Sequence, residues 1–510
     1  MLTIEPQISP EDLGVVNVPQ PQPPLEHHRP AKQPGRADGY AQMMVLSLLL
    51  VAPALICLHS ACANDPDIWW HLRTGQWIFQ HHSIPRIDPF SGPDAGKPWP
   101  AYSWLFEVLT FGLLQKFGLT AIVGYSTVMM LAITTALYHL VRRMQADFSA
   151  VALIVFSACF SLGHLLTPRP WLFTILLFIF EVDILMHVRR TGRVRELLWL
   201  PLIFALWVNI HIQFIDGLVV LGIALVESVA TSRGVGEKTR LGMLPAAAVL
   251  VASLLATLAN PFGWHIYQVA YDLASQPGVL NKINELKAIP FRSLTDWSVL
   301  ALTLGATIAI AREGRGRIFE WMLLAFGIYV SFRSQRDVWV VAVAAATVLA
   351  VTIAPRPNLK IVPMPRFSTM MAAVAATVLL FAGFRVMHIN EPALAKQVGE
   401  TYPVKAVEAI QANHYPGPLY NDFNWGGYLI WSQRMPVSID GRAAFYGDKA
   451  IDRSVATWNG EPDWNTDSLL KQAGIVIGPP KAALTQLLRL DPKYKLVYED
   501  KVATVFIARR

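Results

Sequence analysis

A short run of carboxylates, aromatic rings and a histidine follows the first long apolar stretch of the chain. It reads Asp65-Pro66-Asp67-Ile68-Trp69-Trp70-His71. At the edge of an apolar segment a carboxylate loses hydration, which raises its pKa and suits it to act as a general base. In a second interpretation Asp67 is the N-cap of a helix, and the paired Trp side chains anchor that helix at a membrane surface. The residues alone leave both interpretations open.

More carboxylates and aromatic rings come later in the same segment. They are Asp88, Trp99, Trp104 and Glu107. Aromatic faces beside carboxylates suit a sugar, because the C–H face of the ring stacks on them while the hydroxyls form hydrogen bonds. The segment therefore indicates carbohydrate chemistry.

A metal centre has little support in the sequence. Asp65, Asp67, His71, His81 and His82 could supply ligands, but they have no spacing of the His-Glu-x-x-His kind. We therefore expect neither a metal ion nor another cofactor.

The elements that must position these residues are membrane helices. Hydrophobic residues make up 53% of the 510 residues and charged residues 15%, below the share of about 25% that is usual in soluble domains. The apolar blocks are long enough to cross a hydrocarbon core of about 30 Å. The net charge of +7 does not indicate a nucleic-acid partner, because the basic residues lie in short clusters between apolar blocks, as in cytoplasmic loops.

We predict about eleven transmembrane helices. The segments are 41–61, 120–141, 149–166, 170–187, 196–211, 213–231, 242–261, 297–312, 318–332, 337–354 and 368–385. Basic clusters alternate with turns that are mostly poor in Lys and Arg, which places the N-terminus in the cytoplasm and the C-terminus outside. The stretch 104–116 is amphipathic and short, so we place it in the membrane interface, although a span there would invert everything after it.

Three parts are expected along the chain. Residues 1–40 are rich in Pro and Gln and should form a disordered cytoplasmic tail. Residues 41–388 should form the transmembrane domain, with two long outer loops at 62–119 and 262–296. Residues 389–510 should form an extracytoplasmic α/β domain. Its expected strands are 418–421, 427–431, 437–440, 475–477, 494–498 and 502–507, and its expected helices are 400–413, 463–472 and 481–488.

Gly and Asx residues in the turns of this C-terminal part fit simple backbone reversal. A second interpretation is that Asp440, Arg442 and Trp425 face the membrane part and help to hold a substrate.

The layout resembles the GT-C superfamily of membrane glycosyltransferases. That superfamily includes protein mannosyltransferases, aminoarabinose lipid A transferases and oligosaccharyltransferases. The resemblance rests on an acidic first outer loop directly after the first helix, an interfacial helix in that loop and an outer C-terminal domain. The loop, together with the stretches 207–211, 259–264, 333–336 and 424–442, also resembles a group of largely uncharacterised bacterial membrane proteins.

This resemblance implies transfer of a sugar from a polyprenyl-phosphate donor to a lipid, glycan or protein acceptor, on the outer face of a bacterial inner membrane. It implies that Asp67 or Asp65 is the general base that deprotonates an acceptor hydroxyl. We favour Asp67, because the Pro66 turn would expose it ahead of the paired Trp residues. The mannosyltransferases have an Asp-Glu pair where this chain has Asp-Pro-Asp, so the choice of base stays open.

Other polar residues at outer helix ends fit supporting roles. Arg169, Arg333 and Arg336 are expected to bind the donor phosphate, since Arg can hold phosphate through two N–H groups, although lipid phosphates could occupy them instead. Asn209 and His211 are substrate-binding candidates for which a structural hydrogen-bonding role is equally open. The complete set of predicted substrate-binding residues is Trp69, Trp70, His71, Asp88, Trp99, Trp104, Glu107, Arg169, Asn209, His211, Arg333 and Arg336.

Two other functions compete with sugar transfer. A transporter or flippase would use acidic residues inside the spans, and the candidates are Glu181, Asp183, Asp216 and Glu227. A non-catalytic subunit of envelope polysaccharide assembly would use its outer domain to bind a partner. A cavity that joins Asp67 to Arg336 and opens sideways to lipid would favour transfer.

Overall fold

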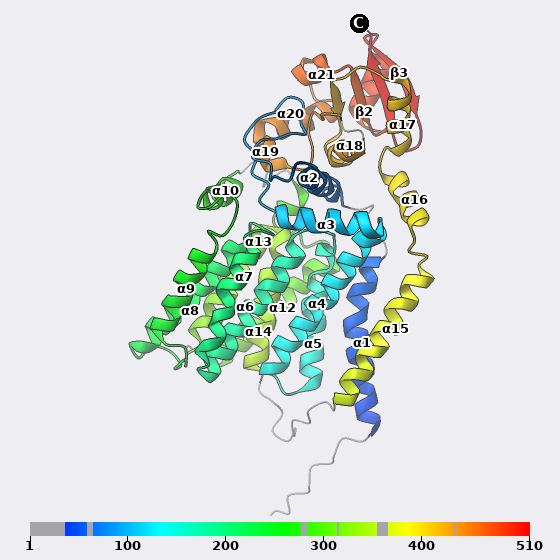
Figure 1. Ribbon diagram of the computed structural model, residues 1–510. Coiled ribbons are helices and arrows are strands. Elements are labelled where there is room, and N and C mark those ends of the chain that lie inside the picture. Colours follow the sequence, from blue (N-terminus) through cyan, green and yellow to red (C-terminus); the bar gives the residue numbers. More distant parts are fainter. Residues whose placement is uncertain are drawn as a thin grey trace, which may run out of the picture.

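The structure is a computed structural model that describes residues 36–58, 65–276, 283–313, 316–353, 366–432 and 435–509. Most of the expected tail, the start of the first outer loop, part of the second outer loop and the basic segment 354–365 therefore lie outside the described residues. A bundle of helices forms the larger part, and a small mixed α/β region covers one end of it (Figure 1). We call that end of the bundle the site end and the opposite end the far end.

A helix lies in each of the eleven predicted segments. The helices are α1 (Arg36–Leu58), α4 (Thr120–Met144), α5 (Phe148–Ser161), α6 (Trp171–Thr191), α7 (Trp199–Trp207), α8 (Phe214–Ser232), α9 (Met243–Ala256), α12 (Leu294–Glu313), α13 (Ile318–Arg333), α14 (Val338–Thr352) and α15 (Arg366–Val386). Among the described residues, six helices are long and apolar enough to cross a membrane, or seven if α15 and the bent continuation α16 (Glu391–Thr401) form one span. The chain is therefore a polytopic helical membrane protein. Eleven crossings remain a prediction, because α5, α7, α9 and α13 are shorter than 18 residues.

The centre of the bundle is built around α14. Its side chains are mostly Val and Ala, and nearly all of them are buried against α5, α12 and α13. Small side chains allow membrane helices to approach closely. At Gly327 of α13, for example, an added Cβ would lie 3.0 Å from the Cα of Val341.

Two helices lie across the site end of the bundle (Figure 1). They are α2 (Ile68–His81) and α3 (Trp104–Phe117), and they pack on each other. Gly75 allows this contact, because an added Cβ would collide with the carbonyl oxygen of Glu107 and lie 2.7 Å from Cβ of Phe111. The crosswise direction of α3 agrees with the expectation that residues 104–116 do not form a span.

The C-terminal region, residues 391–509, covers α2 and α3 from above in the view of Figure 1. Its elements are α16, α17 (Val404–Asn413), β1 (Leu419–Asn421), α18 (Gly426–Ser432), α19 (Ala443–Tyr446), α20 (Asp448–Trp458), α21 (Ser468–Gln472), β2 (Ile475–Gly478), α22 (Ala483–Leu490), β3 (Tyr494–Glu499) and β4 (Thr504–Ala508). The sheet order is β1-β2-β4-β3. Strand β1 is parallel to β2, and the other pairs are antiparallel.

Three expectations for this region were wrong. Residues 427–431 form helix α18 instead of a strand, and this helix packs on α2. The segment 437–440 stays outside the sheet, and Val437 pairs with Ser91 of the first loop. The single helix 400–413 is two helices, because Pro403 has no N–H and interrupts the backbone hydrogen bonds between α16 and α17.

Candidate active site

A cavity of about 1680 Å³ lies between the site end of the bundle and the C-terminal region. The first loop, α10 (His265–Ala274), segment 283–288 and the turn 441–445 contribute to its walls. Of the fourteen predicted site residues, ten line this cavity: Asp65, Asp67, Trp70, His71, Trp99, Glu107, Arg169, His211, Arg333 and Arg336. The lining extends to Tyr329 of α13, whose side chain is exposed on the bundle surface. The cavity therefore joins Asp67 to Arg336 and reaches the side of the bundle.

Arg169, in the turn before α6, bridges the two carboxylates of the first loop. Its Nε donates to both oxygens of Asp65, at 2.8 and 2.6 Å, and its Nη1 donates to Oδ2 of Asp67. Asp65 also accepts a hydrogen bond of 2.9 Å from the backbone N–H of Asp67. The carbonyl of Arg169 accepts from the hydroxyl of Tyr125 at 2.9 Å, which fixes the turn to α4.

Asp67 stands directly before α2, but its side chain accepts no capping hydrogen bond from that helix. Its carboxylate faces Arg169 and the cavity instead. The N-cap interpretation is therefore correct for the position of Asp67 along the chain and wrong for the partner of its side chain.

The pKa of Asp67 is raised to about 7. Burial is the main cause, because it penalises the charged form, and the nearby carboxylates of Asp65 and Glu285 act in the same direction. Arg169 opposes this shift. A carboxylate with a pKa near neutrality suits general-base chemistry, since about half of it is ionised at pH 7 and the ionised form accepts a proton readily.

Arg169 keeps part of its guanidinium available to the cavity. Its Nε and Nη1 are used by Asp65 and Asp67, and Nη1 also lies 3.6 Å from Oε1 of Glu285. Among the described residues, its Nη2 makes no hydrogen bond. An anion in the cavity could therefore accept from Nη2 without displacing either Asp.

His71 and Glu107 form a second buried pair in the cavity wall. Nδ1 of His71 lies 3.2 Å from Oε1 of Glu107, and both side chains are almost fully buried. Burial lowers the pKa of His71 well below its usual value and raises that of Glu107 well above it. Burial therefore favours the uncharged form of both groups. A neutral Glu107 can donate to Nδ1, which leaves the Nε2–H of His71 as a donor.

Polar side chains at the α7–α8 and α13–α14 turns form the opposite wall. The Nδ1 of His211 lies 2.9 Å from Oγ1 of Thr174, which also accepts from Trp207. Burial lowers the pKa of His211 to about 3, so its imidazole is neutral. Arg336 lies 3.7 Å from Asp337, and Arg333 is exposed at the end of α13.

Four predicted substrate-binding residues do not line the cavity. Trp69 packs edge-on against Tyr402 and Tyr428 of the C-terminal region, with ring centroids 5.5 and 5.1 Å apart. Trp104 donates to Oδ1 of Asn209 at 2.8 Å. Asn209 in turn donates to the carbonyl oxygens of residues 205 and 259, so it joins three segments.

The fourth, Asp88, is buried beneath the C-terminal region. It accepts a hydrogen bond of 2.6 Å from Nη1 of Arg442. Arg442 lies over the ring of Trp99 at 4.5 Å and lines the cavity with it. This placement matches the second interpretation of Arg442, in which it faces the membrane part. Trp425, named with it, belongs to the hydrophobic core and not to the cavity lining.

Several cavity residues were absent from the sequence-based set. Glu285 approaches Arg169 from the second loop, Tyr102 lines the wall next to Trp99, and Gly441 reaches Asp67 from the C-terminal region. The unusual length of the loop 262–296 was the only signal for Glu285. In the described part of the chain, no group of three or more His, Cys, Asp or Glu side chains is arranged to hold a metal ion.

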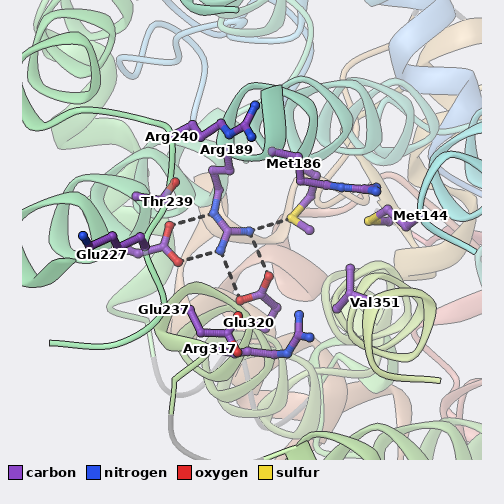
Figure 2. Close-up of a pocket in the computed structure, with 12 residues that line it drawn as sticks. Met144, Met186, Arg189, Glu227, Glu237, Thr239, Arg240, Arg317, Glu320 and Val351 are labelled. Atoms are coloured by element: carbon purple, nitrogen blue, oxygen red, sulfur yellow. Dashed lines mark hydrogen bonds and ion pairs between the residues drawn. The ribbon is translucent and has the colours of Figure 1, made fainter. Parts of the chain in front are cut away.

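A second, smaller pocket of about 420 Å³ lies at the far end of the bundle (Figure 2). At its centre, Arg189 of α6 is bound by Glu227 of α8 and Glu320 of α13. None of the residues that line it also lines the large cavity. The two pockets are therefore separate.

No protein-family profile and no curated protein sequence matches this chain. Its fold is similar to that of the Archaeoglobus fulgidus oligosaccharyltransferase. The crystal structure of the apo form has a TM-score of 0.53 at 10% sequence identity, over 86% of this chain and 69% of that chain. The structure tethered through a disulfide bond to an acceptor peptide containing the NVT sequon has a TM-score of 0.52 at 11% identity, over 92% and 74% of the two chains. The likeness concerns the fold alone, and it is to a GT-C membrane glycosyltransferase.

Proposed function

We propose that this protein transfers a sugar from a polyprenyl-phosphate donor to an acceptor at the site end of the bundle, with Asp67 as general base. The observation that carries the proposal is the single cavity that joins Asp67 and Arg169 to Arg333 and Arg336 and reaches the bundle surface at Tyr329. A lipid-linked donor needs such a lateral opening, because its prenyl chain stays in the bilayer while its head group enters the cavity.

The chemistry follows from the charges around Asp67. Asp67 takes the proton of an acceptor hydroxyl, the acceptor oxygen forms a bond to the anomeric carbon, and the bond from that carbon to the phosphate oxygen breaks. The polyprenyl phosphate leaves with the bonding electrons. A base with a pKa of about 7 is ionised in about half of the molecules at pH 7 and can hold the proton after transfer.

Asp65 has a different role in this proposal. Both of its oxygens are bound by Arg169, and one also accepts from the backbone N–H of Asp67. Asp65 is therefore a positioning residue that orients Arg169 and the backbone of Asp67. This assigns the base to Asp67 and not to Asp65.

Arginines would stabilise the leaving phosphate. Arg169 lines the cavity next to the base with its Nη2 unused by either Asp, and Arg333 and Arg336 line the same cavity. Guanidinium groups suit this task, because they stay charged and present several N–H donors in one plane. The developing negative charge is stabilised most where water is excluded.

The acceptor can be a lipid, a glycan or a protein. The cavity wall formed by residues 422–424 and 441–445 of the C-terminal region is the side that we assign to the acceptor, because Arg333 and Arg336, which we assign to the donor phosphate, come from the helix bundle. One of the similar structures holds an acceptor peptide. A peptide therefore belongs among the acceptors to be tested.

A transport pathway has weaker support. Asp183 is bound by Arg143, and Glu227 by Arg189, so these two candidates are held in ion pairs. Asp216 belongs to the large cavity, which is separate from the far-end pocket. Neither of these two cavities joins both ends of the bundle, as an alternating pathway would require.

The test uses purified protein in lipid nanodiscs with a panel of polyprenyl-phosphate pentoses and hexoses. Formation of free polyprenyl phosphate that depends on the protein and on an acceptor supports transfer. Binding of donors without turnover, for every acceptor class tried, would instead support the non-catalytic subunit.

The orientation is tested separately with phosphatase fusions. A fusion after residue 400 should be active, since the proposal places the C-terminal region in the periplasm, and a fusion near Arg190 should be inactive. The reverse pattern would overturn the orientation.

A further inference from the structure

The turn Asp440-Gly441-Arg442 of the C-terminal region presses directly on Asp67. A Cβ added at Gly441 would collide with Oδ1 of Asp67, and it would lie 2.9 Å from Cγ of that residue and 3.3 Å from Nε1 of Trp70. Only glycine leaves room for the carboxylate here. The other oxygen of the carboxylate, Oδ2, is held by Arg169.

The turn is itself firmly fixed. Arg442 donates from Nε and Nη2 to the two oxygens of Asp440, at 2.9 and 2.7 Å, and from Nη1 to Asp88 at 2.6 Å. Tyr446 donates to Oδ2 of Asp440 at 2.8 Å. All these side chains are buried. Since Asp88 belongs to the same loop as Asp67, the ion pairs hold Gly441 in register with the carboxylate it touches.

A second glycine extends the contact to the backbone before α2. A Cβ at Gly427 would lie 2.7 Å from the carbonyl oxygen of Pro66 and 3.4 Å from the backbone nitrogen of Trp70. Backbone pairing between Gly92 and Val437, at 2.9 Å, ties the loop to the same side of the C-terminal region. The start of α2 therefore rests on two glycines as well as on the rings of Tyr402 and Tyr428 that contact Trp69.

We propose that Gly441 is a positioning residue that fixes the direction of the Asp67 carboxylate against Arg169, so that the C-terminal region completes the site. This inference rests on the proposed function. It gives the turn a role in orienting the base. A C-terminal region that only binds a partner would have no such role. A misplacement of about 1 Å in a reacting group can cost about 10²-fold in rate.

The test compares Gly441→Ala with Gly399→Ala. Gly399 is the matched control, because it lies in the same region and its added Cβ would meet only Val404, at 3.9 Å. Gly441→Ala should lower kcat about 10²-fold with the KM for the donor nearly unchanged, whereas Gly399→Ala should leave both near wild type. Normal kcat in Gly441→Ala, in a protein whose Asp67→Asn variant is inactive, would overturn the inference.

The pH profile separates misplacement from general damage. The charged groups that face Asp67 are Asp65, Arg169 and Glu285, and its titratable neutral neighbours include His71, Tyr102 and Tyr402. A methyl group at position 441 would displace the carboxylate relative to Arg169, whose charge lowers its pKa. The acid limb of the rate profile should then move from its wild-type position. An unmoved limb together with a lower rate would contradict the proposed contact.

A stability measurement tests the contact without any activity. Gly441→Ala should lower the melting temperature of the wild type, but not that of Asp67→Ala, because the smaller side chain makes room for the added methyl. Equal lowering in both backgrounds would show that position 441 does not touch Asp67. If the two sites are coupled in this way and no variant or wild type transfers sugar, the proposed function fails while the contact stands.

Discussion

Two arginines lie among carboxylates, one near each end of the helix bundle. They differ in how many guanidinium N–H groups remain free to bind a ligand. Arg189 at the far end uses all five of its N–H groups: it donates to both oxygens of Glu227, to both oxygens of Glu320 and to Sδ of Met186 (Figure 2). Its guanidinium also lies over the ring of Phe319 at 4.2 Å. Nothing in this cluster remains available to a ligand, so it joins α6, α8 and α13 and does no more.

Arg169 at the site end makes fewer bonds to more carboxylates. Asp65 and Asp67 take its Nε and Nη1, Glu285 stands 3.6 Å away, and Nη2 stays open to a cavity four times the volume of the far-end pocket. Three carboxylates against one arginine leave excess negative charge, which favours proton uptake by Asp67. In the proposed function, the same residue types thus serve as a fixed joint at one end and as a reactive site at the other.

The largest difference between the two ends is expected on substitution of Asp67. Asp67→Asn keeps the shape but removes the basic oxygen, so transfer should fall about 10² to 10⁴-fold. Asp65→Asn should cost less, about tenfold, because Asp65 only orients its neighbours. Rates of polyprenyl phosphate release with matched protein amounts check this. A normal rate in Asp67→Asn with a lost rate in Asp65→Asn would move the base by two residues.

At the far end, a substitution should lower the stability and leave the transfer rate unchanged. Arg189→Met leaves Glu227 and Glu320 buried without a cation, and breaking a buried pair in this way costs about 3–5 kcal/mol of stability. Thermal unfolding in nanodiscs measures the loss, with the exposed neighbour Arg190→Met as control. The rate per folded molecule should stay near wild type. Loss of transfer without loss of stability would mean that the far end is not simply a joint.

Replacement of Arg169 by lysine tests how far the site-end cluster depends on a guanidinium group. Arg169→Lys keeps the charge but cannot bind two carboxylates and a phosphate together. Losing one hydrogen bond between charged groups costs about 1.5–3 kcal/mol, so transfer should fall about 10- to 100-fold. Donor binding measured with a polyprenyl phosphate should weaken as well. Unchanged binding would show that Nη2 does not meet the phosphate.

The raised pKa of Asp67 gives a prediction that can be tested in the wild-type protein. Its raised pKa means that the carboxylate is ionised above about pH 7 and protonated below. Because the base must be ionised, the rate should fall about tenfold per pH unit on the acid side of that value. Measurement of kcat over pH 5 to 9 shows this. A limb near pH 4 would mean that Asp67 has an ordinary pKa.

The smallest effect is expected at the outer arginines of the cavity. Arg333→Gln and Arg336→Gln should each weaken polyprenyl phosphate binding only a few-fold, since exposed charges are screened by water and salt. Arg312→Gln, exposed at the far end, is the control. Equal weakening by all three variants would indicate general attraction of anionic lipid and not a site.

The sequence predicted the features that depend on local pattern. Apolar length located a helix in each of the eleven segments, and the amphipathic, interrupted character of 104–116 predicted that α3 does not run along the bundle. Local pattern failed at 427–431, because a short apolar run fits a strand or a helix equally well. The need for Gly427 to touch the backbone before α2 is a tertiary requirement that alternation does not reveal.

Site residues were predictable where one chain segment carries them. The first loop contains Asp65, Asp67, His71 and Glu107 within about forty residues, and all four line the cavity. The partners of Asp67 come from distant positions: Arg169 is 102 residues away, and Glu285 and Gly441 are farther. Charge and position at a helix end predicted phosphate binding for Arg169, which stays a prediction, and did not reveal its ion pairs with Asp65 and Asp67. A single sequence does not reveal that Gly441 lies against the carboxylate of Asp67, with which a side chain at position 441 would collide.

The ion pair between Asp88 and Arg442 can form only late in the synthesis of the chain. These residues are 354 positions apart, and at about 5–20 residues per second a ribosome needs about 20 to 70 s to pass from one to the other. During that interval Asp65 and Asp67 can already meet Arg169, but Gly441 and Arg442 are still missing from the site. A chain halted before residue 440 should therefore bind lipid but, in the proposed function, transfer no sugar, because neither Gly441 nor Arg442 is present.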